Sequence, residues 1–221
     1  MITVHYLQHS RAHRILWLLE ELGIDYQIRT YRRGADFRGP SELKAVHPLG
    51  KSPVIEDDGR IYAESGAIID YLIDTYGGAG LKPEAGSEAY TRYRYWLHYA
   101  EGSAMPVLFL KIVIARMPRQ VPWLLRPLAR MISKAMVNGF IDPQVVDHLT
   151  FWESELSKDG FFTGSTLTGA DIAMSFPVEA AMTELPKSFA IPAIRRYLDA
   201  IRARPAYKRA LERGAYIFAS S

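Results

Sequence analysis

The sequence predicts an α+β domain with a small mixed sheet, followed by an all-α domain. Strand-like and helix-like stretches alternate over roughly the first 80 residues, whereas the apolar spacing is helical almost everywhere after Gly86. The glycine-rich stretch 77–83 is the best candidate for a linker between them. A chain of 221 residues, 48% of them hydrophobic, can fill two modest cores. We therefore expect domains at residues 1–80 and 86–221.

The elements of the N-terminal domain can be placed in order. The stretch 2–6 has strand composition, and 12–22 has apolar residues at helical spacing before Gly23, a typical helix end. A strand at 25–31 completes a β-α-β unit, which should be parallel and right-handed. There follow a short helix at 41–46, strands at 53–56 and 60–63 joined by a hairpin turn, and a helix at 65–76. This βαβαββα order is the thioredoxin-like arrangement.

The second domain has helical spacing throughout, over 89–105, 106–117, 127–137, 143–156, 170–183, 192–202 and 206–214. One helix start carries a capping box, because Thr168 can accept from the N–H three residues on while Asp171 reaches back to the N–H of Thr168. Leu167 and Ile172 are spaced for the accompanying hydrophobic staple. This motif predicts a role in folding rather than in catalysis.

Composition excludes several classes of function. The chain has 27 Lys and Arg against 24 Asp and Glu, a balanced charge that does not favour nucleic acid. With no cysteine it can form no disulfide, thiolate metal site or cysteine nucleophile, so any thiol chemistry must use a foreign thiol. The N-terminus does not look like a secretory signal, and no apolar run approaches the roughly 18 residues that span a bilayer. We expect a soluble cytoplasmic protein without a metal or a tightly bound cofactor.

Three segments with polar side chains converge at one end of the predicted sheet, and the first surrounds Ser10. This residue lies between the first strand and the first helix, so its hydroxyl is near the positive end of the helix dipole. A hydroxyl there can donate to a bound thiolate and favour its charged form. Taken alone, this segment favours the simpler role of helix cap for Ser10.

The second segment is 47–55, in which Pro53 enters a strand directly after a Gly-containing turn. Such a proline is a candidate for a cis peptide, which would leave the N–H and C=O of Ser52 available to a ligand's peptide unit. An ordinary trans proline at a strand start is the more frequent case. Lys51 can hold a carboxylate or be solvated.

The third segment is 63–69, where Ser65 stands at a helix start and Glu64 precedes it. Free N–H groups with a hydroxyl suit an α-carboxylate, and the neighbouring carboxylate of Glu64 suits an α-amine. Alone this is a weak signal. Together the three segments match glutathione part by part: its thiol, its cysteinyl backbone, its glycine carboxylate and its γ-glutamyl head.

Over essentially its whole length the sequence resembles the cytosolic glutathione transferase superfamily. The most specific motifs are His47-Pro48-Leu49-Gly50-Lys51-Ser52-Pro53 and Ala63-Glu64-Ser65-Gly66, and the segment 9–20 is similar to bacterial members and fungal membrane-associated ones. The resemblance implies a homodimer in which the sulfur of glutathione, the co-substrate, attacks small apolar electrophiles in a detoxification reaction. It implies that Ser10 stabilises the thiolate, with Tyr6 as the rival, and that Lys51, Ser52, Pro53, Glu64 and Ser65 bind glutathione.

The second substrate is less well specified. The resemblance places six residues in the hydrophobic pocket, although core packing explains each one separately: Tyr95, Tyr99, Met105, Phe109, Trp123 and Phe218. Two alternatives to conjugation stay open: a glutathione-dependent peroxidase or disulfide reductase, and a non-catalytic binding protein of the same fold.

The segment 116–130 combines four arginines and three prolines with Trp, Leu and Met. As a hypothesis, it forms a lid over the pocket or a patch that touches an anionic membrane. The simpler alternative, which we favour on the sequence, is a loop and helix start whose arginine stems cover apolar surface.

Overall fold

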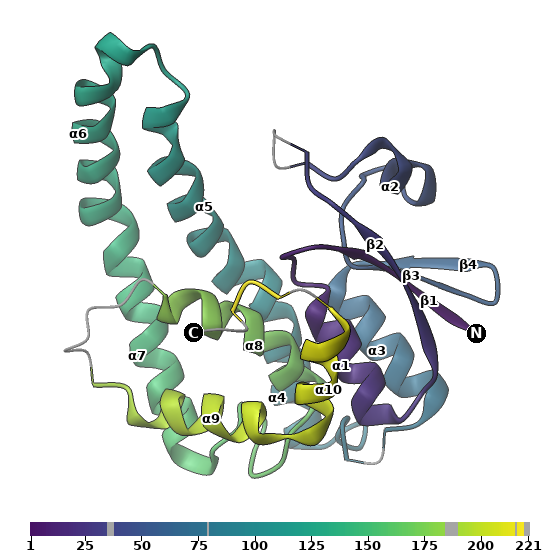
Figure 1. The fold of residues 1–221 in the computed structure, drawn as a ribbon. Helices are drawn as coiled ribbons and strands as arrows, with labels where there is room; N and C mark the ends of the chain where they lie inside the picture. Colours follow the sequence, from purple (N-terminus) through teal and green to yellow (C-terminus); the bar gives the residue numbers. More distant parts are fainter. Residues whose placement is uncertain (35–37, 79, 184–189, 215, 219–221) are drawn as a thin grey trace.

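The computed structural model describes residues 1–34, 38–78, 80–183, 190–214 and 216–218 (Figure 1). Ala79, in the predicted linker, lies outside these residues. The first seven elements follow the predicted βαβαββα order: β1 Ile2–Leu7, α1 His13–Leu22, β2 Tyr26–Tyr31, α2 Ser41–Val46, β3 Val54–Asp57, β4 Arg60–Ala63 and α3 Ser65–Tyr76. The thioredoxin-like prediction is confirmed.

The sheet has the strand order β2-β1-β3-β4. Strands β1 and β2 are parallel, with Ile2 opposite Tyr26, and β1 and β3 are antiparallel, with His5 opposite Val54. Helices α1 and α3 lie along one face, where the buried side chains of Val4 and Ile55 belong to the main core. Leu43 of α2 packs in a separate small cluster with two sheet residues, Leu7 and Tyr31.

The remainder of the described chain is helical, as predicted. Its elements are α4 Glu88–Tyr99, η1 Ala100–Ala104, α5 Met105–Arg116, η2 Met117–Arg119, η3 Trp123–Leu125, α6 Arg126–Met136, η4 Val137–Ile141, α7 Asp142–Asp159, α8 Gly169–Met182, α9 Pro192–Ala203 and α10 Pro205–Arg213. Figure 1 shows α8 beside α1 and α3, so this helix joins the two halves of the molecule.

The predicted helix starts at Pro106 and Pro143 lie one residue after the observed starts of α5 and α7. The breaks expected before them are absent, because both prolines lie inside continuous helical stretches. Each follows a π-helical segment, η1 before α5 and η4 before α7. Proline interrupts an α-helix because it lacks an N–H and its ring meets the carbonyl four residues back. A π turn widens the helix at that point, and the chain then continues in the same direction.

Helices α5 and α6 with their connection, residues 105–136, form what we call the hairpin, and it extends well beyond the rest of the molecule (Figure 1). The two helices meet through a few buried side chains, and the Ser133 hydroxyl donates to the carbonyl of Ile114 at 2.8 Å. The loop and helix start expected in 116–130 are present as η2, η3 and the first turn of α6. The arginine stems do not cover the apolar side chains at the tip, which corrects that part of the expectation. Trp123 is 72% exposed and Leu124 69% exposed.

The predicted capping box begins α8. The Asp171 carboxylate accepts from the N–H of Thr168 at 2.8 Å, and Thr168 caps the N–H of Asp171 in return. Next to it, the N–H of Gly169 donates to Leu81 of the interdomain connection at 2.8 Å. A Cβ at Gly169 would lie 2.7 Å from Ile73 of α3, so this glycine lets α8 approach the first domain closely.

Candidate functional site

Ser10 lies in the turn between β1 and α1, at the junction of the two domains. Its hydroxyl accepts from the N–H of Ala12 at 3.2 Å, and α1 itself begins at His13. Ser10 therefore caps the turn before α1 and does not cap the helix itself. Within the described part of the chain, the Ser10 hydroxyl hydrogen has no protein acceptor. A buried hydroxyl at a helix N-terminus with its proton still to donate suits an anionic ligand.

Tyr6, the rival of Ser10, is fully buried within β1. Burial raises the pKa of its phenol well above the usual value. A Cβ at Gly214 would lie 3.0 Å from its Cζ atom, so the chain after α10 packs directly on the ring. This position favours a packing role for Tyr6 and leaves Ser10 as the more accessible donor.

The Ser52–Pro53 peptide bond is cis, which is the less frequent of the two alternatives that the sequence left open. The Ser52 hydroxyl donates to the carbonyl of His5 at 2.9 Å and accepts from the N–H of Leu7 at 3.2 Å. These bonds link Ser52 to β1 and so extend the contact between β1 and β3 beyond Val54, the last paired residue. Since this side chain holds the strands together, the main chain of Ser52 is the part left for a ligand. Lys51 beside it is exposed.

Glu64 and Ser65 lie where β4 meets α3. Glu64 is exposed and has a φ of 71°, in the left-handed region that non-glycine residues seldom adopt. Ser65 is buried, and its hydroxyl accepts from Nη2 of Arg14 at 3.0 Å. His9, in the turn before Ser10, also has a positive φ, 55°. Such backbone conformations persist where surrounding structure imposes them and are frequent at binding sites.

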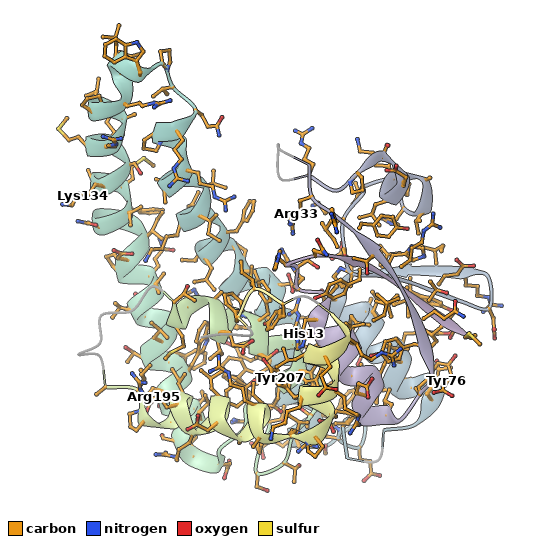
Figure 2. All side chains as sticks on the ribbon, in the orientation of Figure 1. His13, Arg33, Tyr76, Lys134, Arg195 and Tyr207 are labelled. Carbon is orange, nitrogen blue, oxygen red and sulfur yellow. The ribbon has the colours of Figure 1, made fainter. Side chains whose placement is uncertain are left out.

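Sequence reasoning did not assign a role to Arg14. Its guanidinium is fully buried and donates to Ser65 of α3, to the carbonyl of Ala173 in α8 and to Glu101 in η1. This one side chain therefore connects the helix after Ser10 to the start of α3 and to the second domain. Figure 2 shows the neighbouring His13 at the same junction.

Glu101 was also missed. Its carboxylate forms ion pairs with Arg14 and Arg11. Burial by itself raises the pKa of this carboxyl, but the charges of Arg14 and Arg11 outweigh that effect and the net pKa is lowered. One signal in the sequence could have identified it: Glu101 is the only acidic residue between Glu88 and Asp142.

Three predicted pocket residues lie on the side of this junction. Met105 is buried directly after η1, and Phe109 is one turn further along α5, 57% exposed. Phe218 packs against Phe176, whose ring lies 5.7 Å from the Arg14 guanidinium carbon.

The structure does not bring the other three predicted pocket residues to this junction. Along α4 and into η1, the stripe Tyr93, Leu97 and Glu101 faces the first domain, as the contacts of these residues with Asp70, Gly66 and Arg14 show. Tyr95 and Tyr99 are offset from that stripe by about half a turn and line an outer groove of ≈ 610 Å³. Trp123 belongs to η3, in the connection between α5 and α6. That connection is the far end of the hairpin (Figure 1).

The fold and the site first define a class: a thioredoxin-like domain and an all-helical domain that share one buried polar junction. Residues 10–75 match the family model described as glutathione S-transferase, N-terminal domain, and residues 142–205 match glutathione S-transferase, C-terminal domain. Glutathione S-transferase 1 of Saccharomyces cerevisiae is 36% identical, with 96% of this chain and 95% of that protein covered. The chain belongs to the glutathione S-transferase family.

Other relatives agree with this assignment. Glutathione S-transferase 3 of Schizosaccharomyces pombe is 32% identical, covering 96% of this chain and 88% of that protein. A crystal structure of a glutathione S-transferase from Actinobacillus pleuropneumoniae is 34% identical, with a TM-score of 0.79 over 100% of this chain and 97% of that chain. A homologue from Lodderomyces elongisporus, solved with two GSH per subunit, has a TM-score of 0.75 at 19% identity, over 96% of this chain and 97% of that chain, and shows the fold alone.

Proposed function

We propose that this glutathione transferase activates glutathione through Ser10 and transfers it to small apolar electrophiles. The observation that carries the proposal is the state of the Ser10 hydroxyl. Its oxygen is held by the N–H of Ala12, which leaves its proton for a sulfur placed at the start of α1.

The energy required is within reach of these groups. Lowering a thiol from a pKa of about 8.5 by two units corresponds to roughly 2.7 kcal/mol. A hydrogen bond to a charged acceptor contributes about 1.5–3 kcal/mol, and a helix N-terminus typically adds 0.3–1 kcal/mol. Ser10 and the first turn of α1 together can therefore keep the thiol ionised at neutral pH.

The rest of glutathione is assigned to the surrounding segments. Lys51 is proposed to pair with the glycine carboxylate, and the main chain beside the cis Ser52–Pro53 bond to bind the cysteinyl peptide. Ser65 and the N-terminus of α3 would hold the γ-glutamyl carboxylate, while Glu64 receives the α-amine. Arg14 positions Ser65 in this scheme and does not contact substrate.

Met105, Phe109 and Phe218 are proposed to bind the apolar electrophile beside the sulfur. In the reaction the thiol proton passes to solvent and the thiolate electron pair forms a new S–C bond. In a substitution, the leaving group departs with the electrons of the bond that breaks. In an addition, the electrons of the double bond move to the neighbouring atom, which then takes up a proton. No redox partner is needed for either course.

We also propose that the protein works as a homodimer in the cytoplasm, in detoxification, and binds no further cofactor. The outer groove on α4 supports the dimer, because Tyr95, half exposed there, is next to Tyr90, Arg94 and His98. Aromatic side chains and arginine are enriched in protein interfaces. Sedimentation of wild type and Tyr95→Asp tests this: the wild type should be a dimer and the variant a weaker one.

The thiolate proposal is tested by titrating the ultraviolet absorbance of bound glutathione with pH. We expect a thiol pKa about two units below 8.5 in the wild type. Ser10→Ala should return it close to the free value, and Tyr6→Phe should not. A wild-type pKa near that of free glutathione would instead identify a non-catalytic binding protein, and a shift lost only in Tyr6→Phe would assign the role to Tyr6.

The class of second substrate needs a separate comparison. A halogenated aromatic compound and an organic hydroperoxide should be assayed with the same enzyme preparation. We expect faster turnover of the halogenated compound. Turnover of the hydroperoxide alone would favour a glutathione-dependent peroxidase that works without a protein thiol.

A further inference from the structure

The hairpin exposes apolar side chains that nothing else in the described chain covers. The longest exposed run is Trp123, Leu124 and Leu125 at its tip. On α6, Leu128, Ile132 and Met136 continue that surface at intervals of one turn, while Ala129 and Ser133 face α5. An exposed apolar patch of this kind marks a binding surface.

The opposite side of α6 is cationic. Arg126, Arg130 and Lys134 repeat every four residues and are all exposed, and Figure 2 shows Lys134 on the part of α6 that projects from the body. Between Gly102 and Ile141 the sequence contains six Lys or Arg residues and no acidic one. Since the whole chain has a formal charge of only +3, the remainder is net negative. The basic character is therefore concentrated in the hairpin.

The charges of the hairpin indicate which partner can bind it: a second copy of the chain or a lipid surface. A second hairpin from another copy would bring like charges together without a single carboxylate to pair with them. An anionic lipid surface offers both hydrocarbon for the apolar side chains and phosphate for the cationic ones. Tryptophan at the tip fits the same environment, because its indole prefers the boundary between headgroups and acyl chains.

The geometry favours contact with the membrane surface over insertion across the membrane. Among the described residues, the one helical stretch long and apolar enough to span a bilayer is Glu88–Arg119, 32 residues. Its first half is fixed in the protein body: Trp96 is buried, and the Tyr93 hydroxyl donates to Asp70 of α3 at 2.7 Å. Only the hairpin end of this stretch can reach lipid while the fold stays intact.

We propose that the hairpin docks on an anionic phospholipid bilayer, with Trp123, Leu124 and Leu125 in the interface and Arg126, Arg130 and Lys134 against headgroup phosphates. Docking would bring Phe109, on the same hairpin, and the junction below it close to the bilayer. Apolar electrophiles partition into such bilayers. The proposal does not depend on the conjugation chemistry, since it concerns only where the protein binds.

Vesicle flotation of the full chain at low salt is the first test. We expect binding to phosphatidylcholine vesicles that contain phosphatidylglycerol, and little binding to phosphatidylcholine alone. Screening by salt should release much of the bound protein. Equal binding to both vesicle types, or none to either, would overturn the proposal.

Charge variants locate the contact. Arg126→Gln, Arg130→Gln and Lys134→Gln together should weaken binding about 100-fold, because each cation near an anionic surface contributes about 1 kcal/mol. The matched control is Arg195→Gln, Arg196→Gln and Lys208→Gln, which removes the same charge from exposed positions on α9 and α10. Equal losses in the two sets would mean that net charge, and not the hairpin, attracts the protein to lipid.

Fluorescence then reports on the tip directly. Of the four tryptophans, Trp17, Trp96 and Trp152 are buried and only Trp123 is exposed. Brominated lipid in the anionic vesicles should therefore quench Trp123 selectively, and Trp123→Phe should abolish the quenching while keeping the binding. Unquenched emission from vesicle-bound wild type would show that another surface touches the bilayer.

A double substitution, Trp123→Asp with Leu124→Asp, tests the apolar part, and Val146→Asp on α7 is its control. We expect the double variant to bind vesicles at least about tenfold more weakly than the control. Both should be compared by sedimentation without lipid. If the double variant alone turned a dimer into a monomer and left vesicle binding unchanged, the hairpin would be an interface between copies and the proposal would be wrong.

Discussion

The domain junction around Arg14 and the projecting hairpin differ in the burial and pairing of their charged side chains. At the junction, Arg14 and Glu101 are buried or largely buried and satisfy each other within the chain. In the hairpin, Arg126, Arg130 and Lys134 are exposed, the hairpin itself contains no carboxylate, and the apolar side chains beside these cations are uncovered. A buried ion pair is held in one geometry by its partners, whereas a solvated cation on an exposed helix is not.

The difference indicates what each region is built to contact. The junction fixes the position of the turn that carries Ser10 relative to Ser65, because Arg14 binds both the carbonyl of Arg11 and the Ser65 hydroxyl. Precision is useful there, since a thiolate must be met at hydrogen-bond distance. On α5, Met105, Leu108 and Ile114 of the hairpin belong to the main core. The tip and the outer side of α6 are exposed, so their composition is best explained by a partner outside the chain.

Removing Arg14 should have the largest effect on stability. Arg14→Met keeps much of the volume but leaves Glu101 without its buried partner and the carbonyl of Ala173 without its donor. Breaking a buried pair from one side costs about 3–5 kcal/mol. Urea unfolding should show this loss, whereas the exposed Arg119→Met in the hairpin should stay within about 0.5 kcal/mol. Similar losses of unfolding free energy for the two variants would show that the buried pair at the junction is no more important for stability than an exposed arginine of the hairpin.

Asp171 should give the next largest effect, and a pH dependence of known sign. Its carboxylate accepts from the N–H groups of Phe162 and Thr168, and burial raises its pKa from 3.8 to about 6 in spite of those bonds. The folded state therefore holds this proton more tightly than the unfolded state, and stability falls as pH rises between about 4 and 6. Asp171→Asn cannot titrate, so the stability lost on substitution should be larger near pH 4 than above pH 6, by about 1–3 kcal/mol.

Urea unfolding of wild type and Asp171→Asn at several pH values measures that difference. Thr163, which is hydrogen-bonded to Thr168 but carries no charge, provides the control: Thr163→Val should have a cost independent of pH. A difference that grew with pH would mean that hydrogen bonds to the carboxylate outweigh its burial.

Ser65 should affect glutathione binding rather than the chemical step. Ser65→Ala removes a hydroxyl proposed to bind the γ-glutamyl carboxylate, so KM for glutathione should rise roughly tenfold, with kcat nearly unchanged. Ser65→Thr keeps the hydroxyl and should recover part of the affinity, and the exposed Ser157→Ala on α7 should change neither constant. A fall in kcat with unchanged KM would move Ser65 from binding to catalysis.

Features set by neighbouring residues were predictable from the sequence. The capping box of Thr168 and Asp171 and the thioredoxin-like element order each depend on side chains that are adjacent in the sequence. The cis bond before Pro53 was only one of two alternatives, because a Gly-containing turn before a proline allows both. Glu101 was not predictable in the same way, because its partners Arg11 and Arg14 lie about 90 residues away in the chain.

The pocket residues show the same limit. Assigning Tyr95 and Tyr99 to the pocket required knowing which side of α4 faces the first domain, and helical spacing alone does not fix that side. The break expected before Pro106 is absent for a related reason, because the π turn that accommodates the proline ring has no clear signal in the sequence.

The smallest expected effect concerns the hairpin tip. Trp123→Ser should change the free energy of unfolding by no more than about 0.5 kcal/mol, because the side chain is mostly in solvent and loses few contacts. Trp96→Ser, at a buried position on α4, should cost about 3–5 kcal/mol. Thermal unfolding followed by circular dichroism avoids the change in fluorescence. A large loss for Trp123→Ser would mean that the tip packs within the protein in solution, and its exposed side chains would then no longer call for an external partner.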